Sequence, residues 1–597
     1  MKRSDARHFA RITCGTGLAL LAGCQGTPNP LFPHESDTAP PLRLERLRSV
    51  PPADLERHVA PPADAPAPGA PEASRFEGLA RAELTLEECR ASALERNLDL
   101  RVALLDPAIA AESQAEEEGR FEAAFTLSTL WSETDTPTSS SLDSAQQKFQ
   151  RVEPGVRVPL RSGGSAEITL PVTRNETNNS FSTLNPAWNS DLQFSISQPL
   201  LRGAGRRAAT HAIRIASYNR QISETQTKAE VIRQLAAVDR AYWRLYGARG
   251  ALDVRLRQLE LAQAQLERAQ RRFDAGDVPE IEVLRAQAGV AERLDAIIRA
   301  QNAVLQQQRE LKRIINSPGL EVDTTTLLVP ASPPDPVRYE FNRPALIADA
   351  IDNRMELLEL ELRLAADLAT TDWSRNQALP LLALDYTYRI NGLGDSLSNS
   401  LDTLGHNNFE DWQVGLRGEL PIGNAERDAA VRRSLVQRLQ RLGSREAREQ
   451  AIRREVLDAA DEIDSAWQRI LASRQSVILN TRAFQAEERQ FGVGGSTSAD
   501  VLDAAANLAD AQTSEISALV DYQVAQVDLA FATGTLLGAA RVDWEPGDPM
   551  GTLHNVTTTP DEPANAQAQP EASEPTGEPA LEPVAASITE PVANDPR

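Results

Sequence analysis

The stretch DLQFSISQPLLRGAGRRAATHAIRIA, residues 191–216, combines a strand, a glycine-rich corner and the start of a helix. In the strand, Leu192, Phe194 and Ile196 alternate with polar residues, so one face is apolar and the other polar. The corner has the G-x-G-x-x-A spacing of a phosphate-binding turn, but a dinucleotide site requires a continuously apolar strand and a helix of ordinary length. Neither is present here. We therefore interpret the stretch as a corner where a strand becomes a long helix.

That helix has a sustained seven-residue apolar period. No proline interrupts the chain from Thr210 to Phe273, which corresponds to roughly 95 Å of helix. A matching stretch runs from Ala425 to Phe491. Such heptads favour left-handed supercoiling against neighbouring helices, so we expect two long coiled helices. The residues of the first seam are Val231, Val238, Leu245, Leu252, Leu259, Leu266 and Phe273.

The chain is internally duplicated. RRFDAGDVPEIEVLRAQAG, from Arg271, aligns without a gap with RQFGVGGSTSADVLDAAAN, from Arg489. Upstream, QPLLRGAGRRAA at Gln198 aligns with ELPIGNAERDAA at Glu419. Each half is therefore predicted to run short helix, strand, strand, long helix, glycine turn and helix.

The predicted strands are about ten residues long and apolar on one side only, as in a membrane β-barrel with a wet lumen. An ordinary half-buried sheet has the same alternation, but the export signal, the lipidation motif and the duplication favour the barrel. Four strands cannot close a barrel, and an open sheet edge cannot remain in lipid, so the chain is expected to oligomerise. An added hairpin, residues 156–160 and 166–172 around RSGGS, either joins the barrel wall or extends the outer loops.

The N-terminus reads as an export signal. Basic residues precede a short apolar stretch that ends in LAGC, which is similar to a bacterial lipobox and predicts lipidation of Cys24. An ordinary signal peptide with a chance cysteine is the alternative. By the usual sorting resemblance, Gln25 in the next position favours the outer membrane.

Six segments follow from these patterns. The two termini are too poor in apolar residues to form a core. The segments are a signal peptide (1–23), a proline-rich periplasmic linker (24–83), a first repeat (84–318), an inter-repeat linker (319–343), a second repeat (344–540) and a disordered acidic tail rich in Pro and Ala (541–597).

Composition excludes several functions. The net charge of −23, with no basic stripe, argues against nucleic-acid binding. Of the three cysteines, Cys14 and Cys24 lie in the leader, so neither a disulfide framework nor a cysteine metal cage is predicted. We expect no catalytic, cofactor or metal site.

Together these features resemble the TolC family of outer-membrane efflux proteins, over roughly residues 84–537. The match is carried by LTLEECRASALERNLDL, SISQPLLRGAGRRA, RRFDAGDVPEIEVLRAQA and the stretch from RQFGVGGSTSADVLD to AFATGTLL. The resemblance implies a mainly α fold, with a long coiled α-helical tunnel in the periplasm and a trimeric transmembrane β-barrel of about four strands per chain. It implies a lipid-anchored homotrimer in the outer membrane of a Gram-negative bacterium.

The same resemblance implies a passive conduit rather than an enzyme. The trimer would be the exit duct of a tripartite efflux or type I secretion system, opened at its periplasmic tip. A periplasmic adaptor (membrane fusion protein) and an inner-membrane pump would be its partners. The sequence does not indicate the transported substrate.

By resemblance, the turns between the paired helices form the periplasmic tip and dock the adaptor. Plain helix C-caps are the alternative reading of their glycines. The residues of these turns are Gly276, Asp277, Val278, Gly494 and Gly495.

The resemblance also implies a pore constriction and a lock at this tip. Asp500 and Asp503 share one helix face and match the family's two pore aspartates. Six such carboxylates in a trimer would favour cations and raise one another's pKa; a solvated acidic helix start is the alternative. In the lock, Glu282 keeps the carboxylate, but Phe491 lacks the tyrosine hydroxyl and Ser496 stands in the arginine position. We expect a weaker or rewired lock.

The two glycine-rich corners are then hinges where barrel becomes tunnel. The second corner lacks the G-x-G-x-x-A spacing that a phosphate site would require. The hinge residues are Pro199, Gly203, Gly205, Pro421 and Gly423.

One alternative function remains open. A non-conducting coiled-coil lipoprotein that bridges the layers of the cell envelope would explain the heptads, the anchor and the linkers. It would leave the alternating strands and the duplicated corners unexplained.

Overall fold

The computed structural model describes residues 76, 78–138 and 144–542, which belong to one compact unit spanning Ala53–Pro549. The predicted signal peptide, Cys24, most of the first linker and the tail beyond residue 542 lie outside the described residues. The described residues include nearly all of the duplicated middle of the chain.

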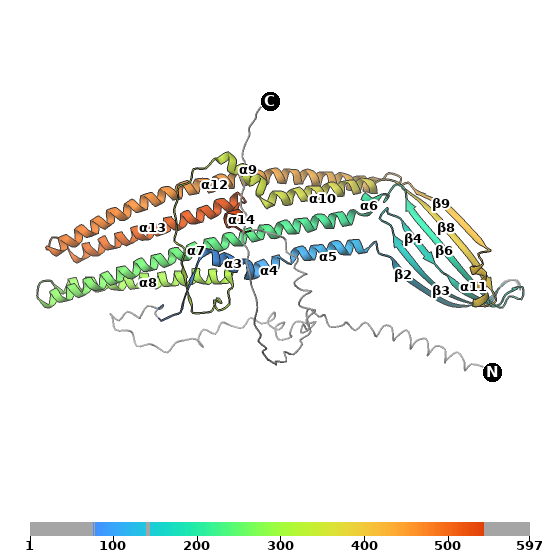
Figure 1. The fold of residues 1–597 in the computed structure, drawn as a ribbon, viewed down its shortest axis with the longest axis horizontal. Helices are drawn as coiled ribbons and strands as arrows, with labels where there is room; N and C mark the ends of the chain where they lie inside the picture. Colours follow the sequence, from blue (N-terminus) through green and yellow to red (C-terminus); the bar gives the residue numbers. More distant parts are fainter. Residues whose placement is uncertain (1–75, 77, 139–143, 543–597) are drawn as a thin grey trace, which may run out of the picture. The chain divides into compact units, whose positions relative to one another are not determined.

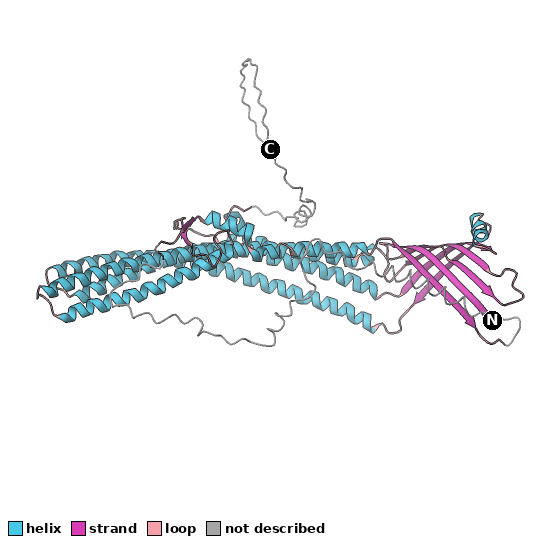
Figure 2. Ribbon diagram, turned by 90° about the horizontal axis from the view of Figure 1, so that it is seen from below, coloured by secondary structure: helices cyan, strands magenta, loops and turns pink. Residues whose placement is uncertain are grey.

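Two long helices organise the described unit. Helix α7 (His211–Asp274) has 64 residues and helix α12 (Ala425–Gly492) has 68. Each turns back into a shorter partner, α8 (Glu280–Ile315) or α13 (Ser498–Ala532), and the two hairpins lie side by side (Figures 1 and 2). The predicted long helices are confirmed to within one residue at each end. Among the described residues, every helix is too short or too polar to cross a bilayer.

Shorter helices continue the hairpins toward the sheet. In the first half, α3 (Leu86–Arg96) and α4 (Leu98–Ala103) lead into α5 (Asp106–Gly119), which packs on α7. In the second half, α9 (Arg343–Asn353) leads into α10 (Met355–Gln377), which packs on both α7 and α12. The remaining helices are α6 (Arg206–Ala209), α11 (Leu397–Gly405) and α14 (Leu536–Ala539).

Seven strands in the described part of the chain form one antiparallel sheet at the end of these helices (Figure 2). Strands β4 and β5 both lie between β3 and β6, separated only by Leu170 and Pro171, so the sheet has six strand positions in the order β2, β3, β4 with β5, β6, β8, β9. The strands are β2 (Ala124–Asp135), β3 (Gln146–Pro159), β4 (Ser165–Thr169), β5 (Val172–Thr177), β6 (Ala187–Pro199), β8 (Leu381–Gly394) and β9 (Glu410–Glu419).

The predicted count of about four strands is therefore too low. The added hairpin around RSGGS joins the sheet, because β3 pairs with β2 on one side and with β4 and β5 on the other. Its turn is built on Gly163, whose φ of +93° suits glycine.

The pairing register separates the two faces of the sheet. Residues directly opposite each other in antiparallel strands project to the same face. One row across the six positions is entirely apolar, whereas the next row is mostly polar and includes a hydrogen bond of 3.0 Å from Arg389 to Gln193. The apolar row is Phe125, Val156, Ile168, Phe194, Tyr388 and Trp412. The polar row is Thr126, Gly155, Thr169, Gln193, Arg389 and Asp411.

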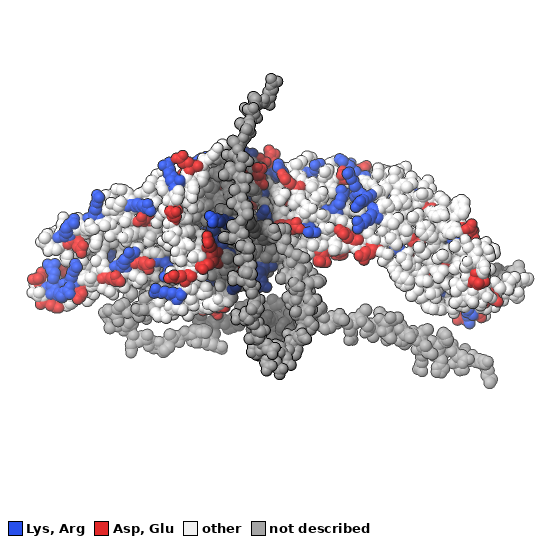
Figure 3. Space-filling model, in the orientation of Figure 1, with Lys and Arg blue, Asp and Glu red and all other residues white. Residues whose placement is uncertain are grey.

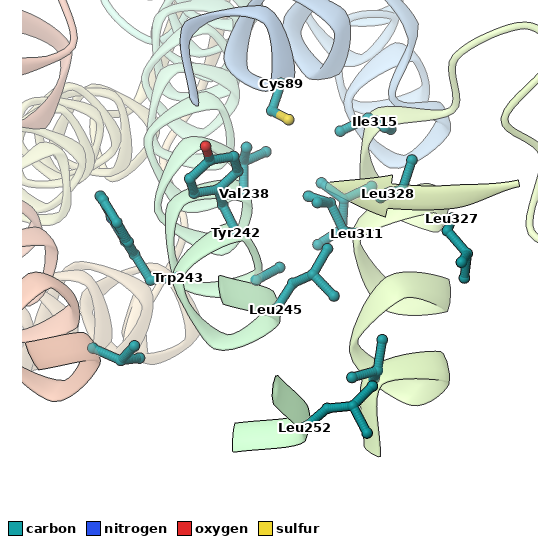
Figure 4. Close-up of a cluster of buried hydrophobic side chains, with 14 of the residues drawn as sticks. Cys89, Val238, Tyr242, Trp243, Leu245, Leu252, Leu311, Ile315, Leu327 and Leu328 are labelled. Atoms are coloured by element: carbon teal, nitrogen blue, oxygen red, sulfur yellow. The ribbon is translucent and has the colours of Figure 1, made fainter. Parts of the chain in front are cut away.

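A small parallel sheet closes the core in the middle of the helices. Strand β1 (Arg81–Leu84) pairs with β7 (Leu327–Pro330), which lies inside the predicted inter-repeat linker. Below them, Tyr242 is fully buried beside Leu245 and Leu311 (Figure 4). The hydroxyl of Tyr242 donates to the carbonyl of Leu84 at 3.2 Å and accepts from the backbone N–H of Ser332 at 2.8 Å. The start of the first repeat and the inter-repeat linker are thus both fixed to the helical core.

Cys89 belongs to this same core rather than to a reactive site. Its side chain is 1% exposed among apolar neighbours, and burial raises the pKa of the thiol to about 12. A thiol this well protected remains protonated and inert at physiological pH.

A charged cluster ties the helices of the second repeat together. Arg354, only 5% exposed, lies 2.8 Å from Glu356 and 3.0 Å from Glu455, and donates to the carbonyl of Ala532 at 3.1 Å. Its guanidinium also lies 5.6 Å from the centre of the Phe531 ring. These contacts connect helices α10, α12 and α13 at one point.

We predict that Arg354→Met lowers the free energy of unfolding by about 2 kcal/mol near pH 7, because two carboxylates lose their buried partner. Burial alone would raise the pKa of Glu356, but hydrogen bonding and charge from Arg354 outweigh it and the pKa is lowered. This stabilisation is present above the unfolded-state pKa and is lost as the pH falls through the lowered folded-state pKa.

Thermal unfolding followed by helical circular dichroism, near pH 7 and at about pH 3, measures this effect. The difference in unfolding temperature between wild type and Arg354→Met should be smaller at about pH 3 than near pH 7. Arg240→Met is the matched control, because Arg240 also lies over the Phe531 ring, at 5.5 Å, but pairs with a single, half-exposed carboxylate, Asp528, at 2.6 Å. Equal losses for the two variants would contradict the role of Arg354.

Candidate functional site

The first helical turn is a glycine-terminated reversal. Helix α7 ends at Asp274, and Gly276 adopts a φ of +80°. The backbone N–H of Gly276 donates to the carbonyl of Phe273 at 2.8 Å, and that of Asp277 to the carbonyl of Arg272 at 2.9 Å. These two bonds form a Schellman cap, in which glycine supplies the left-handed residue at no steric cost.

The second turn repeats this geometry. Gly494 has a φ of +81°, and its N–H donates to the carbonyl of Phe491 at 3.1 Å. The N–H of Gly495 donates to the carbonyl of Gln490 at 2.8 Å. The turns predicted from the repeat are thus both helix caps and the exposed ends of the two hairpins, farthest from the sheet (Figure 1).

Asp500 has a local structural partner in the chain. The N–H of Thr497 donates to Asp500 Oδ2 at 2.9 Å, and the Asp500 N–H donates to Thr497 Oγ1 at 3.3 Å, which makes a capping box. Hydrogen bonds from the hydroxyl and the N–H of Thr497 lower the pKa of Asp500. The mutual rise in pKa that is expected of a carboxylate ring would require the aspartates of other copies of the chain. Within one chain, the geometry favours the alternative interpretation, in which Asp500 belongs to a solvated acidic helix start.

Asp503 lies one turn further along α13 and is exposed, as Asp500 is. No hydrogen bond among the described residues gives Asp503 a capping role. Both carboxylates remain available to a pore at this end of the helices.

The three predicted lock residues do not contact one another in the described chain. Glu282 pairs with Arg285 at 2.8 Å, within its own helix. Ser496 donates to Glu487 Oε2 at 2.9 Å. Phe491 instead meets Arg272, whose guanidinium lies 5.6 Å from the centre of its ring.

The contact between Arg272 and Phe491 joins the ends of the two hairpins, and no motif of the sequence predicts it. Arg272 precedes the first turn and Phe491 precedes the second, so the two residues are about one full repeat period apart in the sequence. A cation over an aromatic face contributes about 0.5–1 kcal/mol at an exposed site. Phe491 therefore links the two hairpins through the face of its ring. This link differs from the one that the tyrosine of the family lock would make.

The first hinge lies where β6 ends at Pro199. Gly203 and Gly205 have φ values of +77° and +88°. The N–H of Gly203 donates to Asn376 Oδ1 at 2.8 Å, and that of Gly205 to the carbonyl of Ser162 at 3.0 Å. The corner is thereby held to α10 on one side and to the added hairpin on the other.

The second hinge is simpler. Pro421 follows the end of β9, Gly423 has a φ of +95°, and Asn424 also has a positive φ. The side-chain amide of Asn424 donates to the carbonyl of Ala378 at 2.9 Å, which anchors the start of α12 to the end of α10. Both predicted hinges are strand-to-helix corners in the structure.

Within the described ranges, no three His, Cys, Asp or Glu side chains gather as metal ligands would.

Comparison with known proteins assigns the family. The model of the family described as outer membrane efflux protein matches residues 167–317 and 346–535, more than half of the chain. Outer membrane protein TolC of Vibrio cholerae is 26% identical over 308 residues, which cover 50% of this chain and 67% of that protein. TolC of Escherichia coli is 27% identical over 309 residues, which cover 50% of this chain and 60% of that protein.

A solved structure shares the fold. The outer membrane channel CmeC of Campylobacter jejuni superimposes with a TM-score of 0.57 at 16% identity, covering 83% of this chain and 97% of that one. The strand-to-helix corners, the duplicated hairpins and the family match thus agree. The chain belongs to the outer membrane efflux protein family, and it is an outer-membrane channel protein of a Gram-negative bacterium rather than an enzyme.

Proposed function

We propose that three copies of the chain form one outer-membrane channel that is the passive exit duct of a tripartite efflux or type I secretion system. The sheet would form the wall of a transmembrane barrel, and the helices would form a periplasmic tunnel that opens at its tip. Cys24 would carry the lipid anchor.

The observation that carries this proposal is the segregation of the two sheet faces. The apolar row from Phe125 to Trp412 crosses all six strand positions, and these two end residues are 71% and 69% exposed. Large apolar side chains left this open suit contact with lipid. The neighbouring polar row suits a water-filled lumen.

The edges of the sheet support oligomerisation. Strands β2 and β9 are the outermost strands and lack a second neighbour in the described chain. Unpaired backbone groups are too costly to leave in lipid, so each edge requires the edge of another copy. Three copies would supply about eighteen strand positions, in the range of barrels that enclose an aqueous channel.

The outer helices support the same assembly. Helices α5 and α12 continue the two edges of the sheet (Figure 1). Both expose apolar side chains, including Ile109 at 63% on α5 and Leu439 at 67% on α12. Packing α5 of one copy on α12 of the next would bury these side chains, and each fully buried one contributes about 1.5–3 kcal/mol.

The tip turns provide the docking surface for a periplasmic adaptor. Gly276, Asp277, Gly494 and Gly495 are all exposed, and Val278 is partly exposed. An inner-membrane pump bound through that adaptor would supply the energy, since the channel itself catalyses nothing. The non-conducting envelope bridge does not require two distinct sheet faces, so conduction decides between the two functions.

We predict that cysteines on the two edges cross-link copies into trimers. Gln413→Cys on β9 would be combined in turn with Thr126→Cys or Ser128→Cys on β2, whose side chains share the polar face. Oxidation should produce a dimer and a covalent trimer on denaturing gels. Pairing Gln413→Cys with Thr169→Cys, in the middle of the sheet, is the control and should give monomer. Bands larger than trimer would contradict the closed assembly.

We predict that the purified protein conducts ions in a planar bilayer and prefers cations. Replacing both Asp500 and Asp503 by Asn should lower the cation-to-anion permeability ratio at least about threefold, because a ring of carboxylates attracts cations. The matched control replaces Asp458 and Asp461, which are also exposed and three apart on a helix. No conductance from intact trimers would favour the bridging function; an unchanged ratio would remove the aspartates from the pore.

We predict that restoring the family lock closes the channel. Phe491→Tyr with Ser496→Arg should lower the single-channel open probability about tenfold, because each charged hydrogen bond is worth about 1.5–3 kcal/mol. The control is Phe491→Tyr with Ser496→Gln, which adds bulk without charge. Equal open probabilities in the two variants would show that the arginine position does not gate this channel.

A further inference from the structure

A basic pocket lies at the first strand-to-helix corner. It has a volume of about 560 Å³ and is bounded by α6, the start of α7 and the end of α10. Its functional groups come mainly from Arg206, Arg207, Arg214 and Trp373. The cofactor-like spacing of the corner does not explain these residues, and neither the hinge nor the channel uses them.

The arginines of the pocket have unused hydrogen-bonding capacity. Arg206 and Arg207 are exposed and make no ion pair with any described residue. Arg214 donates to the carbonyl of Arg207 at 3.2 Å, while its Nε is buried without a partner. Asp372 is the one carboxylate in the lining, and it lies 3.6 Å from Arg375 outside it. The pocket therefore has a net positive charge.

An aromatic side chain forms one wall of the pocket. Trp373 is 37% exposed and stacks on His211, with ring centroids 5.0 Å apart and planes 15° apart. This stacking fixes the indole beside the guanidinium groups. Tryptophan is enriched at the level of lipid headgroups, where one side of its ring is apolar and the other is wet.

The pocket adjoins the turn of the added hairpin, at the end of the sheet nearest the helices. Gly205, in its lining, is hydrogen-bonded to Ser162 in the turn of the added hairpin. In the space-filling view, Lys and Arg side chains gather at the sheet ends of the helices, next to a sheet face with few charges (Figure 3). A basic pocket at the margin of an apolar band lies at headgroup depth if that band is in lipid.

We propose that this pocket binds the phosphate of an anionic glycerophospholipid in the leaflet nearest the helices. Guanidinium groups match phosphate oxygens in bidentate geometry, and two exposed arginines beside a third form a fork for one phosphodiester. The acyl chains would lie along the apolar row of the sheet. The inference rests on the proposed function, because the membrane position of the sheet places the pocket at the headgroups.

The test is native mass spectrometry of the full-length protein in detergent, titrated with dihexanoylphosphatidylglycerol or dihexanoylphosphatidylcholine. The wild type should bind phosphatidylglycerol more tightly than phosphatidylcholine, and Arg206→Gln with Arg207→Gln should weaken that binding on the order of tenfold. Arg214→Gln should weaken it as well. The matched control replaces Arg268, Arg309 and Arg482, which are exposed arginines on the helices away from the sheet.

Three results would overturn the inference. These are no preference of the wild type for phosphatidylglycerol, an equal loss in the control variant, and displacement of the lipid by equimolar inorganic phosphate, which would indicate a free-anion site. Trimer retention on gels would confirm that each variant is folded. Bilayer conductance of the same samples separates the two proposals: conductance without lipid preference defeats only the lipid site, whereas lipid preference without conductance defeats only the channel.

Discussion

The constraint on which the rest of this structure depends is that a sheet in lipid must leave no backbone group unpaired and no charge on its outer face. The register meets the second requirement along the row from Phe125 to Trp412, whereas Glu133, Lys148 and Arg174 share that face only toward the strand ends far from the helices. It cannot meet the first within one chain, since β2 and β9 end the sheet. The proposed assembly, with its enclosed lumen, would supply the missing strand partners.

The helices extend the same arrangement away from the membrane. Each glycine corner redirects an outer or inner strand into a helix of more than sixty residues, and each helix returns as a hairpin whose cap is again a glycine. In the middle, Arg240 of α7 pairs with Asp528 of α13 at 2.6 Å, and near the end Arg272 links the two hairpins weakly through Phe491. A firm middle and a lightly joined end are suited to motion at the tip.

Periodicity predicted the long helices and both corners because those signals are local and repeated. Periodicity undercounted the strands because two breaks interrupt the alternation of apolar and polar residues. Strand β3 contains Pro154 and Gly155, and its partner is divided into β4 and β5 at Leu170 and Pro171. The pairing of β1 with β7 was not foreseen, since each has only four residues and the partners are far apart in sequence.

At the tip and corner sites, the sequence likewise predicted the local features but not the contacts between helices. The glycines were recognisable from the repeat, and the arginines of α6 were visible beside the corner. The approach of Arg272 to Phe491 depends on how the hairpins pack, and the stacking of Trp373 on His211 depends on how α10 meets α7. No local pattern encodes either contact.

In the proposed channel the sheet is a wall between lipid and water, with the added hairpin as part of that wall. Spin labels placed singly at Val156, Arg157, Trp412, Gln413 and Val414, in protein reconstituted into vesicles, would measure it directly through collisions with oxygen and with a water-soluble nickel complex. We expect strict alternation on both strands, with oxygen favoured at Val156, Trp412 and Val414 and nickel favoured at Arg157 and Gln413. Equal access of nickel to every position would contradict it.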